Sequence, residues 1–240
     1  IFAKVSYLGT NYHGWQKQPN AYSIQEEIEK VLSKILNTKI DIFGSGRTDA
    51  GVHAKGQTFH FEVNKEVDLD KLRYSANMLL PNDIHIIELV KVDEDFHARF
   101  SAKGKHYQYV INFGEKDPFS FLTSYHYPYG FDYDLLRDSL QLFVGKHNFQ
   151  NFTSKEEDED NFVRTISSIN LFQRGNYLYI DLIGNGFMRY MIRDIVGTCL
   201  AVASNKEDIK FISSKLDSND RDIVSYKADS EGLYLIDVIY

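Results

Sequence analysis

Asp49 is the residue of this chain best placed for acid–base or nucleophilic chemistry. It lies in the run GSGRTDAGVH at residues 44–53, between an apolar run at 40–43 and an alternating run at 57–63. Both flanks predict strands, so the run is expected to be a loop fixed by a sheet at its two ends. Its glycines allow a sharp bend and the close approach of a ligand. Such a loop can present a single carboxylate to a substrate on a rigid scaffold.

Several cationic and aromatic residues are further candidates, each with a structural alternative. Arg47 either bonds loop carbonyls or reaches a ligand beside Asp49. Arg189 and Arg193 are spaced i, i+4 and share one helix face, where they are either functional or surface arginines with buried stems. Tyr107 lies on a predicted strand face that also suits a core residue.

Metal and nucleotide cofactors are not expected. Asp49, His53 and His60 do not have the spacing of a metal-binding helix, and no carboxylate cluster accompanies them. The two histidines are better interpreted as hydrogen-bonding residues of the loop and the strand. Neither a Walker nor a Rossmann glycine pattern occurs in the chain, so we predict no nucleotide cofactor.

Composition points to a globular protein of the cytoplasm. Of the 240 residues, 43% are hydrophobic and 25% charged, which is ordinary for a globular chain. No apolar run approaches the roughly 18 residues that cross a bilayer, and the start lacks the pattern of a signal peptide, so no membrane association is expected. The single cysteine, Cys199, lies in an apolar helical run and suits a reducing compartment, as a buried hydrophobe rather than a reactive thiol.

The distribution of charge matters more than its total. A net charge of −7 argues against nucleic-acid binding when taken alone. One acidic block at 156–160 supplies five of the negative charges and is typical of a solvated loop that would repel phosphate. Basic residues gather instead in or beside the motifs described here: Arg47, Lys55, Arg99, Lys103, Lys105, Arg189 and Arg193. The sequence is therefore compatible with a basic cleft on an acidic protein.

The expected elements form an α+β protein with two halves, at 1–102 and 103–240. In the first half, Ser23 and Asp68 begin two helices among four strands, which gives the βαββαβ order of a ferredoxin-like motif. The elements expected in the first half are 2–8, 24–36, 40–43, 57–63, 69–80 and 84–92. Those of the second half are 105–113, a helix from Asp132 or Asp134 to near Gly145, 163–172, 177–183, 188–203 and 233–239.

Six short motifs occur in order along almost the whole chain. They are YHGWQKQ at 12–18, GRTDAGVHA at 46–54, FHARFSA at 96–102, KHYQY at 105–109, FMRYMIR at 187–193 and EGLYL at 231–235. Together they resemble the tRNA pseudouridine synthases of the TruA family. The resemblance implies the pseudouridine synthase fold, with two ferredoxin-like halves that share a mixed, mainly antiparallel sheet around a central cleft.

The resemblance also assigns roles to four residues. It implies that Asp49 starts uridine isomerisation, at the base or at the ribose, and that Arg193 is the basic residue that pairs with this carboxylate. Tyr107 would stack on the flipped uracil and Leu233 would pack on its other side. We favour a role for Arg47 within the RNA, holding the extruded nucleotide. Arg189 falls where the family pattern is looser and has no assigned role.

The function expected from the resemblance is conversion of uridine to pseudouridine in the anticodon stem-loop of tRNA, at positions 38 to 40, by a homodimer. Two alternatives are an RNA-binding module without catalysis and a metal-dependent hydrolase of RNA. The intact set of Asp49, Tyr107 and Arg193 weighs against the first. The absence of a metal-ligand pattern weighs against the second.

Overall fold

The chain forms two compact units in a computed structural model that describes residues 1–154, 161–218 and 220–240. The first unit comprises Ile1–Lys103 with Tyr234–Tyr240, and the second comprises Gly104–Leu233. The sequence placed residues 103–240 together, whereas the structure groups the last seven with the first unit. The reason is a non-local strand pairing, which no local pattern reveals. In the described part of the chain, no helix has the length and apolar character needed to span a membrane.

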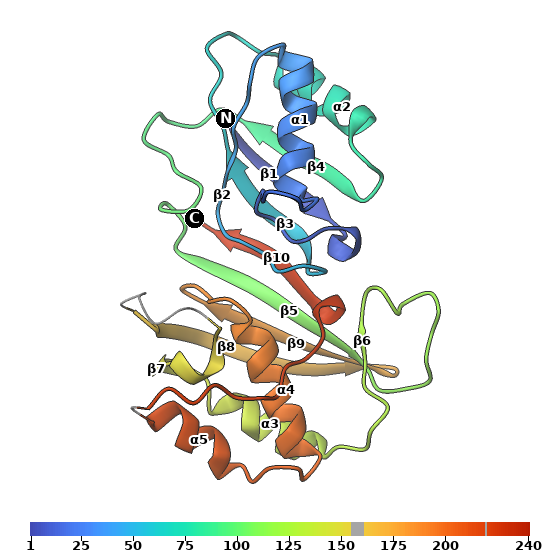
Figure 1. Ribbon diagram of the computed structural model, residues 1–240, viewed down its shortest axis with the longest axis vertical. Coiled ribbons are helices and arrows are strands. Elements are labelled where there is room, and N and C mark those ends of the chain that lie inside the picture. Colours follow the sequence, from blue (N-terminus) through green and yellow to red (C-terminus); the bar gives the residue numbers. More distant parts are fainter. Residues whose placement is uncertain (155–160, 219) are drawn as a thin grey trace. The chain divides into compact units, whose positions relative to one another are not determined.

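The first unit has the element order predicted from the sequence (Figure 1). Its elements are β1 (Phe2–Tyr7), η1 (Gly9–Asn11), α1 (Ile24–Leu36), β2 (Phe43–Gly44), β3 (His53–His60), α2 (Leu69–Leu79) and β4 (Ile84–Val90). β1 pairs antiparallel with both β3 and β4, and β2 pairs antiparallel with β3. The order β4-β1-β3-β2 is that of a ferredoxin-like sheet.

Strand β3 has two partners along one edge. Phe43 of β2 lies opposite His60, at the carboxyl end of β3. The final strand, β10 (Leu233–Ile239), pairs in parallel near the other end, where Tyr234 lies opposite His53. β3 also starts at His53 rather than at the predicted Gln57, so the preceding loop is shorter than expected. Its pairing with β1, which sets Tyr7 opposite Ala54, extends the strand to that point.

The second unit contains a mainly antiparallel sheet, in which β6 pairs in parallel with β5, and its described residues form three α-helices. Its elements are β5 (Gly104–Asn112), β6 (Tyr125–His126), α3 (Tyr133–Gln141), β7 (Gly145–Asn148), η2 (Gln150–Phe152), β8 (Val163–Arg174), β9 (Tyr177–Gly184), α4 (Met191–Ala203), α5 (Lys210–Asp217) and η3 (Ser230–Gly232). β5, β9, β8 and β7 are neighbours in that order, and all these pairs are antiparallel. The α+β class predicted from the sequence is confirmed.

The helix starts follow the capping residues in three cases. The side chains of Ser23, Asp68 and Asp132 each accept a hydrogen bond from the backbone N–H three residues on, at 3.3, 3.1 and 3.0 Å. The fourth prediction was wrong, because α4 begins at Met191 and not at Met188. Tyr190 adopts a left-handed conformation, with φ of 63°, and this separates Met188 from the helix.

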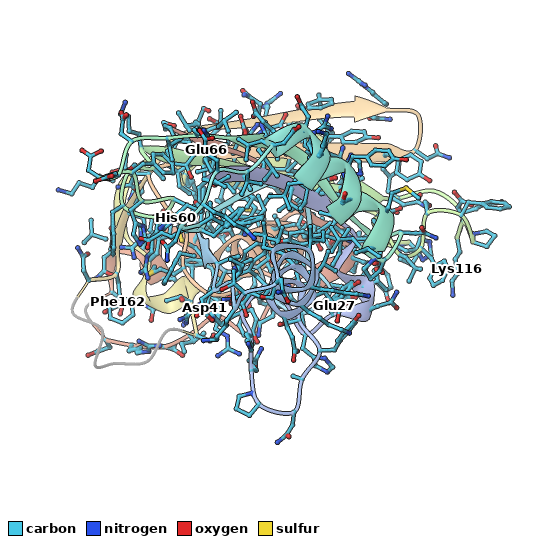
Figure 2. The ribbon with its side chains drawn as sticks, turned by 90° about the horizontal axis from the view of Figure 1, so that it is seen from above. Glu27, Asp41, His60, Glu66, Lys116 and Phe162 are labelled. Atoms are coloured by element: carbon cyan, nitrogen blue, oxygen red, sulfur yellow. The ribbon has the colours of Figure 1, made fainter. Side chains whose placement is uncertain are left out.

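The long connection between β5 and β6 carries several exposed side chains. Lys116, labelled in Figure 2, lies on it, together with the exposed apolar residues Phe119, Phe121 and Leu122. The cores are made of side chains from the sheets and helices, and Ile28 of α1 and Ile195 of α4 are fully buried. Cys199 is buried on α4, and burial raises the pKa of its thiol, which suits the predicted inert hydrophobe. The acidic block at 156–160 lies outside the described residues.

Candidate active site

The Asp49 loop, residues 45–52, is fastened to β3 at its base. Ser45 donates its backbone N–H to the carbonyl of Thr58 at 2.8 Å, and the side-chain amide of Gln57 donates to the carbonyl of Gly46 at 2.9 Å. At the tip, the N–H of Val52 donates to the carbonyl of Asp49 at 3.1 Å, and Gly51 has φ of +78°. The loop therefore closes in a tight turn around the partly exposed Asp49.

A second motif, residues 12–18, holds this loop from the other side. The backbone N–H of Trp15 donates to the carbonyl of Thr48 at 3.1 Å, and the backbone N–H of Gly51 donates to the carbonyl of Tyr12 at 3.3 Å. Gly14 lies so close that a Cβ atom there would be 2.5 Å from the Thr48 carbonyl oxygen. The structure thus brings together two motifs that are separate in the sequence, and one of them acts as a backbone brace for the other.

Helix α1 extends this brace. Its first N–H groups, from Ile24 and Gln25, donate to the carbonyls of Gly14 and Trp15 at 3.2 and 3.0 Å. Helix N-termini carry N–H groups without intrahelical partners, so a neighbouring segment can satisfy them. The consequence is a continuous path of hydrogen bonds from α1 through Gly14 and Trp15 to Thr48.

Buried aromatic side chains support the loop from within the first unit. The hydroxyl of Tyr7 lies 2.8 Å from Oγ1 of Thr48, and burial raises the pKa of Tyr7, so the phenol stays protonated. Trp15, the only tryptophan of the chain, is 1% exposed and packs against Gly44, where a Cβ atom would be 2.4 Å from the indole nitrogen. Sequence reasoning missed Tyr7 and Thr48, because each looks like an ordinary strand or loop residue.

Arg47 is exposed beside the loop, and its Nε donates to the side-chain oxygen of Gln16 at 3.2 Å. The structural alternative considered from the sequence was bonding to loop carbonyls. The partner is instead the Gln16 side chain of the motif at 12–18, and Arg47 lies at the surface two residues before Asp49.

The two histidines near the loop bond to backbone N–H groups, as expected. Nδ1 of the fully buried His53 accepts from Gly9 at 3.0 Å, and Nδ1 of His60 accepts from Ala98 at 3.2 Å. Burial lowers the pKa of His60, and the neighbouring His97 lowers it further, which favours the neutral ring that this bond needs. Across residues 1–154, 161–218 and 220–240, no group of three or more His, Cys, Asp or Glu residues has an arrangement suited to a metal ion.

In the second unit, Tyr107 is buried on β5, opposite Leu182 of β9. Its ring meets that of Phe187 edge-to-face, with centroids 5.3 Å apart. Tyr109, two residues on, is fully buried and its hydroxyl donates to the carbonyl of Asp229 at 2.6 Å. The structure therefore places Tyr107 against the motif at 187–193, while Tyr109 is a core residue that fixes the segment before Leu233.

Arg193 is tied to the same segment from α4. Its Nε donates to the carbonyl of Ala228 at 2.8 Å, and the N–H of Ala228 donates back to the carbonyl of Arg193 at 3.0 Å. Burial raises the pKa of Glu231, and the positive charge of Arg193 opposes that rise. The cation is thus held close to residues 228–231, just before Leu233.

Leu233 is 5% exposed and follows the short helix η3. The preceding Gly232 packs on the ring of Tyr109, since a Cβ atom there would be 2.7 Å from that ring. Of the five site residues predicted from the sequence, Arg47 and Asp49 belong to the first unit, and Tyr107, Arg193 and Leu233 belong to the second. The contacts described above fix the segments that carry these residues, each within its own unit.

Comparison with known proteins agrees with these motifs. A family described as tRNA pseudouridine synthase matches residues 3–101 and 140–240, which include every predicted site residue except Tyr107. The tRNA pseudouridine synthase A of Streptococcus uberis is 38% identical over 242 residues, covering 99% of this chain and 97% of that protein. The protein of the same name from a Geobacillus species is 41% identical, covering 100% and 98%.

A solved Cbf5–Nop10–Gar1 complex is a weaker match. It has a TM-score of 0.41 and 14% sequence identity, covering 83% of this chain and 45% of the matched one. The fold and the sequence matches define an α+β enzyme of the isomerase class that acts on uridines of tRNA. The chain belongs to the tRNA pseudouridine synthase family.

Proposed function

We propose that this enzyme converts uridine to pseudouridine in the anticodon stem-loop of tRNA, at positions 38 to 40, and that Asp49 starts the reaction. The observation that carries the proposal is the Asp49 loop. It is a glycine-flanked turn with one partly exposed carboxylate, braced by backbone bonds from residues 12–16. A scaffold of this kind holds a reactive group in place without help from a cofactor.

The chemistry asks for little more than a positioned carboxylate. The C1′–N1 bond of the nucleoside breaks, the base turns over, and a C1′–C5 bond forms. The proton on C5 leaves and N1 gains one, so the reaction needs neither an oxidant nor a hydrolytic water. Asp49 acts in its ionised form, either as a nucleophile toward the base or at the ribose carbon.

The remaining predicted residues have roles in holding the nucleotide. Tyr107 stacks on the uracil, which suits its aromatic contact with Phe187, and Leu233 packs on the other face. Arg193 supplies positive charge, which favours the ionised carboxylate on which the reaction depends. The exposed guanidinium of Arg47 enters the RNA and offsets the cost of extruding the base, on the order of a few kcal/mol.

We further propose that the enzyme is a cytoplasmic homodimer that works without a metal or nucleotide cofactor. The support is the family membership for the assembly and the single cysteine for a reducing compartment. Sedimentation of the purified protein, with and without tRNA, tests the dimer. A monomer under both conditions would contradict it.

Asp49→Asn is the decisive test of the function. Asn keeps the size and turn preference of Asp but removes its charge and nucleophilicity. With tRNA transcript labelled with tritium at C5 of uridine, the wild type should release tritium, and Asp49→Asn should lose at least about three orders of magnitude in rate. Binding of tRNA should change little.

Asp41→Asn is the matched control, because Asp41 is an exposed carboxylate of the same unit that pairs with Lys39. It should retain the wild-type rate. Tritium release by Asp49→Asn at the rate of this control would remove Asp49 from the mechanism.

A further inference from the structure

Three cations surround the ring of Tyr190 in the second unit. Nζ of Lys227 lies 4.0 Å from the ring centroid, and the guanidinium carbons of Arg189 and Arg193 lie 4.8 and 5.2 Å from it. Nη2 of Arg189 also donates to the Tyr190 hydroxyl at 3.0 Å. A single aromatic ring can stabilise a cation, but three like charges gathered around one ring also repel one another.

Backbone contacts fix the positions of the segments that carry these side chains. The segment that carries Lys227 is bonded to α4 through Ala228 and Arg193. It also lies against Gly197, where a Cβ atom would be 2.8 Å from the carbonyl of Tyr226. Tyr190 itself is held in a left-handed conformation, with φ of 63°, which is costly for a residue with a bulky side chain.

Two of the cations have no counter-charge in the described part of the chain. Arg189 and Lys227 are exposed, and neither forms an ion pair with a residue among 1–154, 161–218 and 220–240. They lie next to the first turn of α4, where the helix dipole disfavours positive charge. Among the described residues, no carboxylate offsets the positive charges of Arg189 and Lys227, and such a cluster of exposed cations suits an anionic ligand.

We propose that Arg189, Tyr190 and Lys227 form a clamp for a phosphodiester of the RNA strand. Arg189 offers planar guanidinium donors and Lys227 a compact ammonium, while the Tyr190 ring keeps the two groups apart and oriented. The inference rests on the proposed function for the identity of the RNA. It gives Arg189, to which the sequence assigned no role, a positioning role distinct from that of Arg193.

The test compares two double variants in binding an unmodified tRNA transcript at several KCl concentrations. Arg189→Ala with Lys227→Ala removes the clamp. Arg174→Ala with Lys206→Ala is the matched control, since each of these residues is also a cation over one aromatic ring of the second unit, Phe172 or Tyr129. Both doubles remove two positive charges, so they alter the net charge of the protein equally.

The clamp double should bind tRNA roughly tenfold more weakly near 0.1 M salt, with a log–log salt slope shallower by about 1.5. The loss should appear in Kd and KM and much less in kcat. The control should stay within about twofold of the wild type. Arg189→Lys with Lys227→Arg should regain most of the binding, because both charges are kept. Equal Kd values and equal slopes for the two doubles would overturn the clamp.

Thermal melting without RNA separates the clamp from a merely structural cluster. Removing cations that oppose a helix dipole should leave Tm unchanged or raise it, whereas removing structural contacts would lower it. If the double variant fails to fold, Lys227→Ala alone carries the same comparison against Lys206→Ala. Pseudouridine mapping with the wild type keeps the two proposals separate. If the wild type forms pseudouridine but the clamp double binds tRNA as tightly as the control double, only the clamp is refuted. If the wild type forms no pseudouridine, the proposed function is refuted.

Discussion

At the scale of single residues, the Asp49 loop depends on a glycine at position 14, because no side chain fits there. Gly14 has φ of +91°, and a Cβ atom there would be 2.5 Å from the Thr48 carbonyl oxygen and 3.1 Å from the carbonyl carbon of Asp49. Gly14→Ala should therefore destabilise the protein by about 2–4 kcal/mol, combining the left-handed strain with the clash. It should also lower kcat at least tenfold, because the clash displaces the backbone of Asp49.

Gly175→Ala is the control for backbone strain alone. Gly175 also has a positive φ, of +57°, but an added Cβ atom there would have nothing within 4 Å. This variant should lose about 1–2 kcal/mol and keep its kcat. Urea unfolding and the tritium-release assay measure the two effects. The brace would be contradicted if Gly14→Ala lost stability but formed pseudouridine as fast as Gly175→Ala.

The residues of the site differ in how visible they are in the sequence. Asp49 stands out because glycines and a neighbouring cation surround it between two predicted strands. Tyr7 and Thr48, which support it through a 2.8 Å contact, do not stand out, since that contact joins residues 41 positions apart. The cations around Tyr190 are equally hidden, because Lys227 meets the ring only through the folding of a distant segment. Local patterns mark reactive groups, but not the long-range contacts that hold them.

At the scale of elements, fraying of α1 should reduce catalysis at the Asp49 loop, whereas fraying of α2 should not. Ser23 caps α1, whose first N–H groups bond to Gly14 and Trp15, whereas Asp68 caps α2, whose first N–H groups form no such bond with the described residues of the 12–18 motif or the Asp49 loop. Ser23→Ala and Asp68→Ala should each cost about 1 kcal/mol of unfolding free energy. Only Ser23→Ala should lower kcat as well, by a factor of about 3 to 10, because fraying of α1 loosens the brace.

The pair is measured by urea unfolding and by initial rates at saturating tRNA. Equal loss of kcat in both variants would mean that global stability, and not the path from α1 to Thr48, governs the rate. A loss of stability confined to Asp68→Ala would show that the Ser23 side chain, although fully buried, does not act as a cap.

The elements that the sequence predicted best are those with a local signal at each end. α1 and α2 follow capping residues and apolar periodicity, and the hairpin of β8 and β9 surrounds Gly175. The start of α4 was wrong, since the apolar pattern continues through a residue whose backbone is left-handed. The short elements β6, β7 and α5 were missed, because two to eight residues carry too little periodicity to separate a strand or a helix from a loop.

At the scale of the whole molecule, the last strand shows the limit of a sequential division into halves. β10 follows the second unit along the chain, yet pairs in parallel with β3 of the first. Parallel partners need a long crossover, so their register has no signature in neighbouring residues. The net charge of −7 is equally uninformative as a total, because clusters of cations such as the one around Tyr190 set the local electrostatic potential of the surface.

The reaction as a whole should proceed without a divalent metal ion. It exchanges one glycosidic bond for another, with no redox or hydrolytic step, and in the described residues no group of His, Cys, Asp or Glu is arranged to hold a metal. His53 and His60 use their Nδ1 atoms to accept hydrogen bonds from the backbone N–H groups of Gly9 and Ala98. With tRNA folded beforehand in monovalent salt, the initial rate of tritium release in EDTA should stay within about twofold of the rate without chelator. Melting of the tRNA under both conditions controls for RNA structure. A rate that collapses in EDTA while the tRNA stays folded, and recovers only with an added divalent ion, would favour a metal-dependent site and count against carboxylate chemistry at Asp49.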